Sequence, residues 1–261
     1  MKVVHRVLDP GDSAHAFKRA CALAVMTKAP RAGQVKTRLT PPLTPDEAAA
    51  LNICFLRDTT AAISEAAANG LACGIAVYTP VGAEEAYAEI LPEAFELVPQ
   101  RGDAFGDRLA FATEDILSLG FESACLIDSD SPTVPPHVFA EAAAILARPG
   151  GTIVLGPSDD GGYYLIGLKK LYRSLFTEID WSTERVLNQT IERAGQLGLK
   201  VHLLPAWYDV DDHATLRRLC QEFFGPNGSS PRAYPAPATR SYLDDLLQRE
   251  GRDRIWPNEQ S

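Results

Sequence analysis

The sequence has few cysteines, and no two of them lie close together. Five cysteines are scattered over 261 residues, and none forms a Cys-x-x-Cys pair. A disulfide framework or a zinc site would normally show closely spaced cysteines. We therefore expect reduced, buried thiols and a cytoplasmic protein.

Long apolar runs and an excess of positive charge are also missing. No apolar run approaches the length of a transmembrane helix, and His5, Arg6 and Asp9 interrupt the only N-terminal stretch that could resemble a signal peptide. The 25 Lys and Arg residues against 34 Asp and Glu residues give a formal net charge of −9. Such a charge argues against a general nucleic-acid-binding or anionic-membrane surface, so we expect neither partner.

Short apolar stretches alternate with helical patterns through most of the chain. Strands are expected at 21–27, 71–79, 95–98, 124–127, 152–156, 163–168 and 201–204, and helices at 44–69, 83–91, 103–120, 135–147, 183–194 and around 216–223. Alternation of this kind favours an α/β fold with a mostly parallel sheet and helices on both faces. The two adjacent strands after residue 150 indicate that the sheet is mixed.

Composition divides the chain into three parts. Residues 1–20 have no clear period, and we expect a loose N-terminal lead-in there. Residues 21–224 form the predicted α/β domain. Proline, glycine and serine dominate 225–237, which is typical of a linker. The 225–261 segment is therefore predicted to be a linker and tail, with one short helix at 240–249.

Two carboxylates follow the apolar stretch at 124–127. Asp128 and Asp130 are separated by one residue, so in an extended chain their side chains point to the same side, about 7 Å apart. They can face one divalent cation at the carboxyl end of a strand, where α/β sheets usually bind ligands. A solvated turn is the alternative, because Asp-Ser-Asp-Ser-Pro is also good turn chemistry.

The loop after the first expected strand is basic in an otherwise acidic chain. Lys28, Arg31, Lys36 and Arg38 fall within eleven residues, between a strand end and a well-capped helix start. Phosphates commonly bind at such a place. The loop lacks the glycine spacing of a P-loop and of the Gly-x-Gly-x-x-Gly fingerprint. A solvated loop with scattered charge is the alternative.

Three ordered motifs together resemble one family. They are Lys28-Ala-Pro-Arg-Ala-Gly-Gln-Val-Lys-Thr-Arg-Leu, Asp128-Ser-Asp-Ser-Pro, and Gly156-Pro-Ser-Asp-Asp-Gly-Gly-Tyr-Tyr-Leu-Ile-Gly-Leu. Over about residues 21–222 the chain resembles the glycosyltransferase-A-like transferases associated with radical-SAM and selenodomain proteins. More remotely, 35–39 is similar to 2-phospho-lactate guanylyltransferases, and 209–211 to sugar-nucleotide pyrophosphorylases and molybdenum-cofactor guanylyltransferases.

The resemblance implies a nucleotide-diphospho-sugar transferase fold of the glycosyltransferase-A type. It also implies a nucleotide over the first strand and Mg²⁺ or Mn²⁺ at Asp128 and Asp130, since these hard cations prefer oxygen ligands. Within that fold Lys36 and Arg38 would neutralise diphosphate oxygens.

Asp103 and Arg108, at the start of the 103–120 helix, could contact base or ribose. Helix capping and solvated charge are the simpler explanation of these two residues.

The motif at 158–162 contains paired acids and paired glycines. Glycines before a strand permit close backbone approach or positive φ, and they make Gly161 and Gly162 candidate substrate-binding positions. Asp159 and Asp160 are candidate catalytic residues that could bind a sugar hydroxyl or activate an acceptor. A tight hairpin turn is the alternative, because Asp-Gly alone predicts one.

Three acids precede the last core helix. Asp212 is the expected N-cap of that helix, and Asp211 is a candidate metal-side carboxylate. His213 could add a nitrogen ligand, although a single histidine is more often incidental. For Trp181 and Trp207 we expect aromatic core, with sugar stacking as the alternative.

These features leave three functions open. The first is glycosyl transfer from a nucleotide-diphosphate sugar to an unidentified small-molecule or lipid acceptor. The second is nucleotidyl transfer from a nucleoside triphosphate to a phosphorylated small molecule, as in the guanylyltransferases. The third is a catalytically silent nucleotide-binding partner of another enzyme. Only Gly33 lies between Ala29 and Thr40, so the glycine-rich loop of many nucleotidyltransferases is thin here, which favours the first function.

Overall fold

The structure is a computed structural model and describes residues 3–11, 21–226 and 233–255. Its strands are β1 (Cys21–Lys28), β2 (Ala72–Thr79), β3 (Glu96–Pro99), β4 (Ser123–Ile127), β5 (Thr152–Pro157), β6 (Tyr163–Leu168) and β7 (Lys200–Leu203). Its α-helices are α1 (Pro45–Ala67), α2 (Phe105–Ser118), α3 (Pro136–Ala147), α4 (Val186–Gln196), α5 (His213–Phe224), α6 (Pro237–Glu250) and α7 (Arg252–Ile255). Short 3-10 helices are η1 (Thr37–Leu39), η2 (Glu84–Tyr87) and η3 (Arg173–Leu175).

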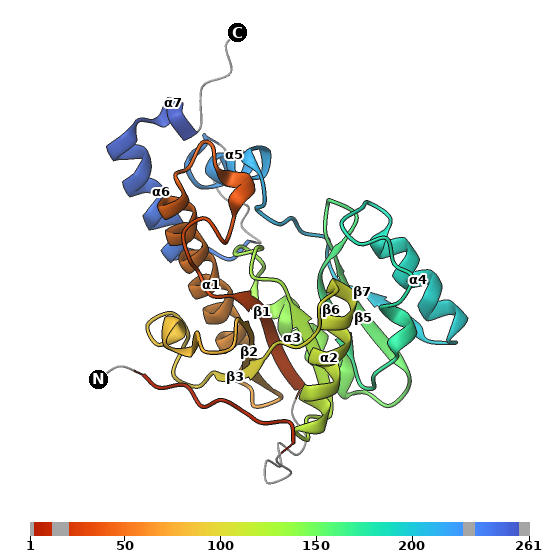
Figure 1. The fold of residues 1–261 in the computed structure, drawn as a ribbon. Coiled ribbons are helices and arrows are strands. Elements are labelled where there is room, and N and C mark those ends of the chain that lie inside the picture. The colour runs from red at the N-terminus through yellow and green to blue at the C-terminus, as the bar shows by residue number, and fades with distance from the viewer. Residues whose placement is uncertain (1–2, 12–20, 227–232, 256–261) are drawn as a thin grey trace.

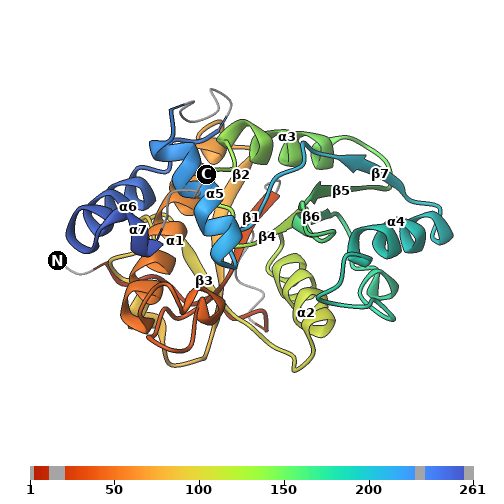
Figure 2. The ribbon, with the colours of Figure 1, turned by 90° about the horizontal axis from the view of Figure 1, so that it is seen from above.

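The strands form one mixed sheet in the order β3-β2-β1-β4-β6-β5-β7. Strand β6 runs antiparallel to both of its neighbours, while the other pairings are parallel. Alternate residues of β1 enter different cores: Leu23 packs with apolar residues of α1 and α3, and Ala24 with those of α2. The helices therefore cover both faces, as Figure 2 shows, and the predicted α/β architecture is confirmed.

Most predicted elements form with small shifts at their ends. Thr44 caps α1 in a reciprocal capping box with Glu47, and Pro45 is the first helical residue. The helix predicted at 83–91 is instead the short η2, followed by a turn that buries Leu91. The helix predicted at 240–249 is present, and it extends over the whole of α6.

The N-terminal lead-in is less loose than expected within its described residues 3–11. The backbone N–H of Leu8 donates to the Leu97 carbonyl at 2.8 Å, and the Leu8 side chain is fully buried. His5 Nδ1 lies 2.9 Å from the Phe95 carbonyl oxygen. These contacts hold the segment beside β3. Its position thus depends on hydrogen bonds to distant residues and on the burial of Leu8, which the local sequence pattern does not reveal.

A third apolar cluster supports the loops at the carboxyl ends of the strands. It joins Leu39 of η1, Phe55 of α1, Val210 and residues of α5 and α6. Figure 1 shows α6 lying along α1 on the side away from α4. The division predicted at residue 225 stays a prediction, and the 227–232 part of the linker lies outside the described residues. Part of the tail nevertheless packs against the segments that carry the candidate site.

Candidate functional site

Three segments converge where β1, β4, β5 and β7 have their carboxyl ends. Asp128 directly follows β4, Ser158 directly follows β5, and Asp209 lies in the stretch between β7 and α5. Backbone bonds hold the segments together: Val210 N–H donates to the Asp130 carbonyl, and Asp159 N–H to the Trp207 carbonyl, both at 2.9 Å. Strand β1 is parallel to β4, β5 is parallel to β7, and β6 between them is antiparallel to both β4 and β5, so these loops lie at one edge of the sheet.

Asp128 and Asp130 lie in a compact turn at the end of β4. Asp128 accepts hydrogen bonds from Ser131 Oγ at 2.8 Å and from the Asp130 N–H at 3.3 Å. Burial, followed by repulsion from Asp130 and Asp209, raises the pKa of Asp128 well above its ordinary value. The turn geometry is therefore present, and the Asp128 carboxyl in it is half-buried and lies close to other acidic side chains.

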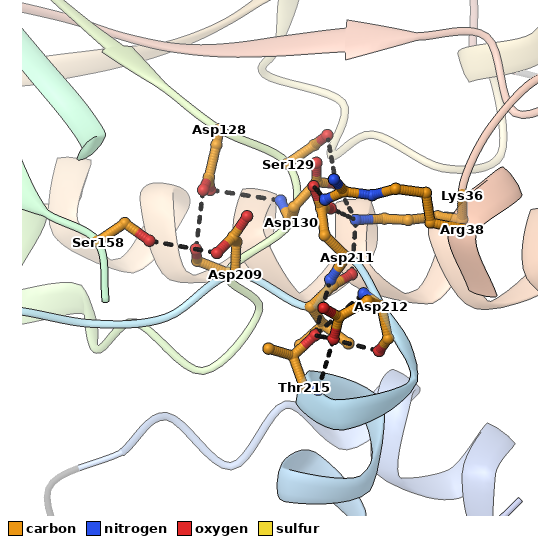
Figure 3. A network of polar contacts seen from close by, with 12 residues as sticks. Lys36, Arg38, Asp128, Ser129, Asp130, Ser158, Asp209, Asp211, Asp212 and Thr215 are labelled. Atoms are coloured by element: carbon orange, nitrogen blue, oxygen red, sulfur yellow. Dashed lines mark hydrogen bonds and ion pairs between the residues drawn. The ribbon is translucent and has the colours of Figure 1, made fainter. Parts of the chain in front are cut away.

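Lys36 is the cation that offsets part of this negative charge. Its ammonium lies 2.7 Å from Asp130 Oδ1 and 2.8 Å from Asp211 Oδ1, and it also donates to the Val210 carbonyl at 2.8 Å (Figure 3). Burial opposes the charge on Lys36, but attraction by the two carboxylates outweighs it and raises the pKa. The left-handed backbone of Lys36, with φ of 50°, turns the loop so that the side chain points inward.

Arg38 and Asp211 complete this ion-pair network. Arg38 Nη2 lies 2.9 Å from Asp211 Oδ2, so each oxygen of Asp211 pairs with a different cation. Burial would raise the pKa of Asp211, but Lys36 and Arg38 together lower it. Both oxygens are thereby occupied, which leaves Asp209 as the less encumbered acid of this segment.

Asp209 belongs to the Asp209-Val-Asp211 motif but is not among the residues that the sequence predicts for the site. It accepts a hydrogen bond from Ser158 Oγ at 3.2 Å. Burial and repulsion by Asp211 and Asp160 raise its pKa to about 6. The sequence signal was the same i, i+2 spacing seen at Asp128, but local spacing alone could not distinguish Asp209 from Asp211.

Two cavities meet at this network. The first, the basic cavity, has a volume of about 360 Å³ and is lined by Lys28, Gln34, Val35, Lys36, Thr37, Arg38, Asn52, Ser129, Asp130 and Asp211. The second, the aromatic cavity, has a volume of about 340 Å³; its charged lining residues are Asp128, Asp130, Asp160, Asp209 and Asp211, and its rings come from Phe105, Tyr163, Tyr164 and Trp181. Ser129, Asp130 and Asp211 line both cavities.

The predicted basic residues divide between the basic cavity and other places. Lys28, Lys36 and Arg38 line the basic cavity. Arg31 is exposed in the same loop but does not line the cavity. Arg108, in the first turn of α2, donates to the carbonyls of Gly102 and Asp103 at 3.3 and 3.1 Å, so it contacts the loop that precedes its own helix. Among the described residues, neither Asp103 nor Arg108 lines either cavity.

The predicted acids and glycines at 158–162 also separate. Asp160 lines the aromatic cavity and accepts a hydrogen bond from Gly162 N–H at 2.8 Å. Asp159 instead pairs with Arg218 Nη1 at 2.6 Å and lines neither cavity. Gly161 has φ of +88°, and a Cβ there would lie 2.4 Å from the Glu184 carbonyl oxygen. The hairpin therefore needs glycine at 161, while Asp160 is presented to the cavity.

Other candidates have structural partners. Asp212 is the N-cap of α5 and accepts from Thr215 N–H, as predicted. His213 is the first residue of α5 and lines neither cavity. Trp207 donates from Nε1 to Thr133 Oγ1 and packs against the α1–α3 core, whereas Trp181 lines the aromatic cavity.

Comparison with known proteins supports the fold. A crystal structure from Desulfovibrio desulfuricans G20, of a proposed nucleotide-diphospho-sugar transferase, is 28% identical; the match covers 90% of this chain and 99% of that chain, with a TM-score of 0.74. A nucleotidyl transfer enzyme from Methanothermobacter thermautotrophicus is 14% identical over 77% of this chain and 95% of that chain, with a TM-score of 0.52. The fold is that of nucleotide-diphospho-sugar transferases.

A family described as an uncharacterized protein conserved in bacteria (DUF2064) matches residues 62–183. No curated protein matches the sequence. The expected association with radical-SAM proteins stays a prediction. None of the helices in the described ranges combines the length and hydropathy that a bilayer span requires.

The donor set fits a divalent cation only if a ligand completes it. Within residues 3–11, 21–226 and 233–255, no group of three or more His, Cys, Asp and Glu side chains is placed to hold a metal ion. Asp130 and Asp211 already pair with Lys36. Asp128 and Asp209 remain as crowded oxygen donors whose mutual repulsion a cation would relieve. Carboxylate and phosphate oxygens are the ligands that Mg²⁺ and Mn²⁺ prefer, so the residues fit a metal bound together with a diphosphate.

Proposed function

We propose that the protein transfers a glycosyl group from a nucleotide-diphosphate sugar to a hydroxyl of an acceptor. The observation that carries this proposal is that Ser129, Asp130 and Asp211 line both cavities and so form a wall shared by the two. On one side of Asp130 lies a cavity whose lining includes Lys28 and Arg38, in addition to the buried Lys36 that pairs with both lining carboxylates, and two such cations suit a diphosphate. On the other side lies a cavity with an apolar, aromatic lining. A donor and an acceptor bound in these cavities would meet beside Asp130. The proposed activity of the Desulfovibrio relative points to the same class of donor.

Charge in the aromatic cavity favours glycosyl over nucleotidyl transfer. The described residues that line it include five aspartates and no Lys, Arg or His. A phosphorylated acceptor, as nucleotidyl transfer requires, would find no cationic side chain among these lining residues to neutralise its phosphate, which is a barrier to its binding. A neutral hydroxyl acceptor meets no such barrier. The alternative rests on the similarity of 35–39 to guanylyltransferases and on a fold shared with a nucleotidyl transfer enzyme.

The chemistry needs a base beside the acceptor and stabilisation of the leaving diphosphate. The acceptor hydroxyl oxygen would form a bond to the anomeric carbon while the bond from that carbon to the diphosphate oxygen breaks. The electron pair leaves with the nucleoside diphosphate, and the hydroxyl proton passes to Asp160, which lines the aromatic cavity. Arg38, exposed at the basic cavity, would stabilise the diphosphate. Asp128 and Asp209 would hold Mg²⁺ or Mn²⁺, which when bound offsets charge on the leaving group.

The released product decides between the candidate reactions. A thermal-shift panel of nucleotide-sugars and nucleoside triphosphates, with and without Mn²⁺, identifies the nucleotide that binds. Incubation with that nucleotide and candidate acceptors then yields nucleoside diphosphate if glycosyl transfer is correct. Pyrophosphate would establish nucleotidyl transfer instead. A bound nucleotide that is never turned over would favour the silent binding partner.

Asp160→Asn tests the proposed base. We expect the variant to keep its melting temperature and to lose turnover by roughly 10²–10⁴-fold, the usual contribution of a general base. Asp159→Asn is the matched control, because Asp159 is the neighbouring acid and pairs with Arg218 outside both cavities. Equal losses in the two variants would remove Asp160 from this role.

A further inference from the structure

The aromatic cavity has a wall of rings next to its acidic end. Trp181 contacts Phe105 edge to face with ring centroids 5.0 Å apart, and Tyr163 with centroids 6.5 Å apart. Phe105 is the first residue of α2 and is 53% exposed. Leu109 and Val186 extend the apolar lining. An aromatic side chain left this exposed beside a cavity marks a surface for an apolar ligand.

The protein backbone is shaped to hold Trp181 in that wall. A Cβ at Gly106 would lie 2.9 Å from Trp181 Nε1 and 2.4 Å from the Phe176 carbonyl oxygen, so glycine makes room for the indole. Glu178 and Ser182 flank Trp181 and both have positive φ, at 55° and 63°. Non-glycine residues in this region are strained, and such strain clusters at ligand sites. Two independent features thus fix the ring at the cavity.

The volume of the aromatic cavity and the charge of its lining restrict the class of ligand further. The volume of about 340 Å³ lies at the lower end of ligand pockets, which span about 300–1,000 Å³, so it suits one or two rings rather than a long lipid chain. Asp160 lines the cavity and, among the described residues, forms no ion pair of 4.0 Å or less with a Lys or Arg, whereas Asp128 and Asp209 are the proposed metal ligands. An anion would be repelled from this end.

We infer that the aromatic cavity is the acceptor subsite and that it takes a compact ring compound bearing a hydroxyl and no negative charge. This inference rests on the proposed function, because it names the acceptor class of that same site. The ring stacks among Phe105, Tyr163 and Trp181 while its hydroxyl points to Asp160. This acceptor class excludes carboxylated and phosphorylated compounds and long-chain lipid alcohols.

Three phenols of similar size test the inference. The probes are 4-hydroxybenzyl alcohol, which is neutral, tyramine, which is cationic, and 4-hydroxybenzoate, which is anionic at neutral pH. Binding to the full chain is measured by ligand-observed NMR titration in EDTA, so that no divalent cation offsets the charge of the lining aspartates. We expect tyramine to bind at least as well as the neutral alcohol, and the benzoate to bind roughly tenfold or more weakly than either. Equal binding of the benzoate and the alcohol would overturn the inference.

A variant pair locates the binding. Phe105→Ala should weaken 4-hydroxybenzyl alcohol binding roughly three- to tenfold, the scale of an aromatic contact. Leu203→Ala is the matched control, because Leu203 is 51% exposed on β7 and does not line the cavity. Unchanged binding in Phe105→Ala, or an equal loss in Leu203→Ala, would overturn the assignment.

Different results would contradict the proposed glycosyl transfer and the inferred acceptor class. Nucleotide titration with Arg38→Ala reports on the basic cavity alone, since Arg38 does not line the aromatic cavity. Nucleotide binding and turnover without the expected order of phenols would overturn the acceptor class and leave glycosyl transfer standing. The expected order of phenols, with pyrophosphate as the only product, would overturn glycosyl transfer and leave the ligand class of the cavity standing.

Discussion

Lys36 and Arg38 pair with the same carboxylate from very different environments. The Lys36 side chain is 4% exposed and the Arg38 side chain 69% exposed, while Asp211 lies between these extremes at 34%. When a buried cation is removed, water cannot take its place beside the carboxylates that it paired with. When an exposed cation is removed, water can solvate its former partner. Lys36 therefore serves mainly the fold of the site, and Arg38 is the cation left accessible to a ligand.

This difference predicts unequal effects on stability. Lys36→Met should lower the free energy of unfolding by about 2–4 kcal/mol, because it strands Asp130 and Asp211 without their shared cation; their partial exposure keeps the loss near the lower part of the range for buried pairs. Arg38→Met should cost under about 1 kcal/mol. Denaturant unfolding of both ligand-free variants measures this, and equal losses would show that the burial of Lys36 is unimportant.

Asp128 makes the opposite contribution to stability. Burial first, and repulsion by Asp130 and Asp209 second, raise its folded-state pKa well above the ordinary value of 3.8. The folded protein thus holds this proton more tightly than the unfolded chain does. Stability from this group is present at low pH and is lost as pH rises from about 4 towards the raised pKa.

Asp128→Asn should therefore stabilise the protein at neutral pH. Asparagine is close in shape and can still bond Ser131 and Asp130 N–H, but it has no charge to bury. In EDTA, the gain in unfolding free energy over the wild type should be larger at about pH 8 than at about pH 5. Exposed Asp245→Asn provides the control. A gain that shrinks as pH rises would contradict the assigned direction.

At the scale of elements, α6 is attached to α1 by one buried acid. Asp58, in the middle of α1 and 2% exposed, accepts from Ala238 N–H at 3.0 Å and from Thr239 N–H at 2.7 Å. These are N–H groups at the start of α6, which lack partners within the helix. Asp58 thus supplies a cap from a different helix, some 180 residues earlier in the chain.

Asp58→Ala should loosen α6 before the rest of the fold. The buried Thr239 N–H and the partly buried Ala238 N–H would lose their acceptor, which costs about 1–3 kcal/mol for a buried group and less for a partly buried one. Hydrogen–deuterium exchange should accelerate across α6 while β1 stays protected. Asp244→Ala, an exposed change within α6 itself, should leave exchange nearly unaltered. Loss of protection spread evenly over both elements would mean that α6 does not open separately.

Elements were predicted well where local rules govern them. The capping box at Thr44 and the alternation of apolar strands and helices depend on residues close in sequence, and both were correct. The pairing of Lys36 with Asp211 joins residues 175 apart, so no local pattern reveals it. The same limit explains why no local pattern predicts the contacts of Lys36 with Asp130 and Asp211.

For the molecule as a whole, metal and nucleotide should bind cooperatively. Asp128 and Asp209 supply too few oxygens for a cation, and a diphosphate meets uncompensated carboxylates without one. Each ligand should raise the affinity for the other by the same factor, on the order of 5–150-fold. Calorimetric titration of the nucleotide with Mn²⁺ and then with EDTA measures the factor, and Asp128→Asn should abolish it. Equal affinity in both conditions would leave the Asp-Ser-Asp segment as a turn only.

The wall formed by Ser129, Asp130 and Asp211 also constrains the kinetics of a two-substrate reaction. Because these residues line both cavities, we expect both substrates of the proposed reaction to be bound at the same time, with their reacting groups beside these three residues. A covalent enzyme intermediate that links two separate half-reactions would then not be needed. Initial rates measured against one substrate at several fixed levels of the other would give intersecting rather than parallel reciprocal lines, the pattern of a ternary complex.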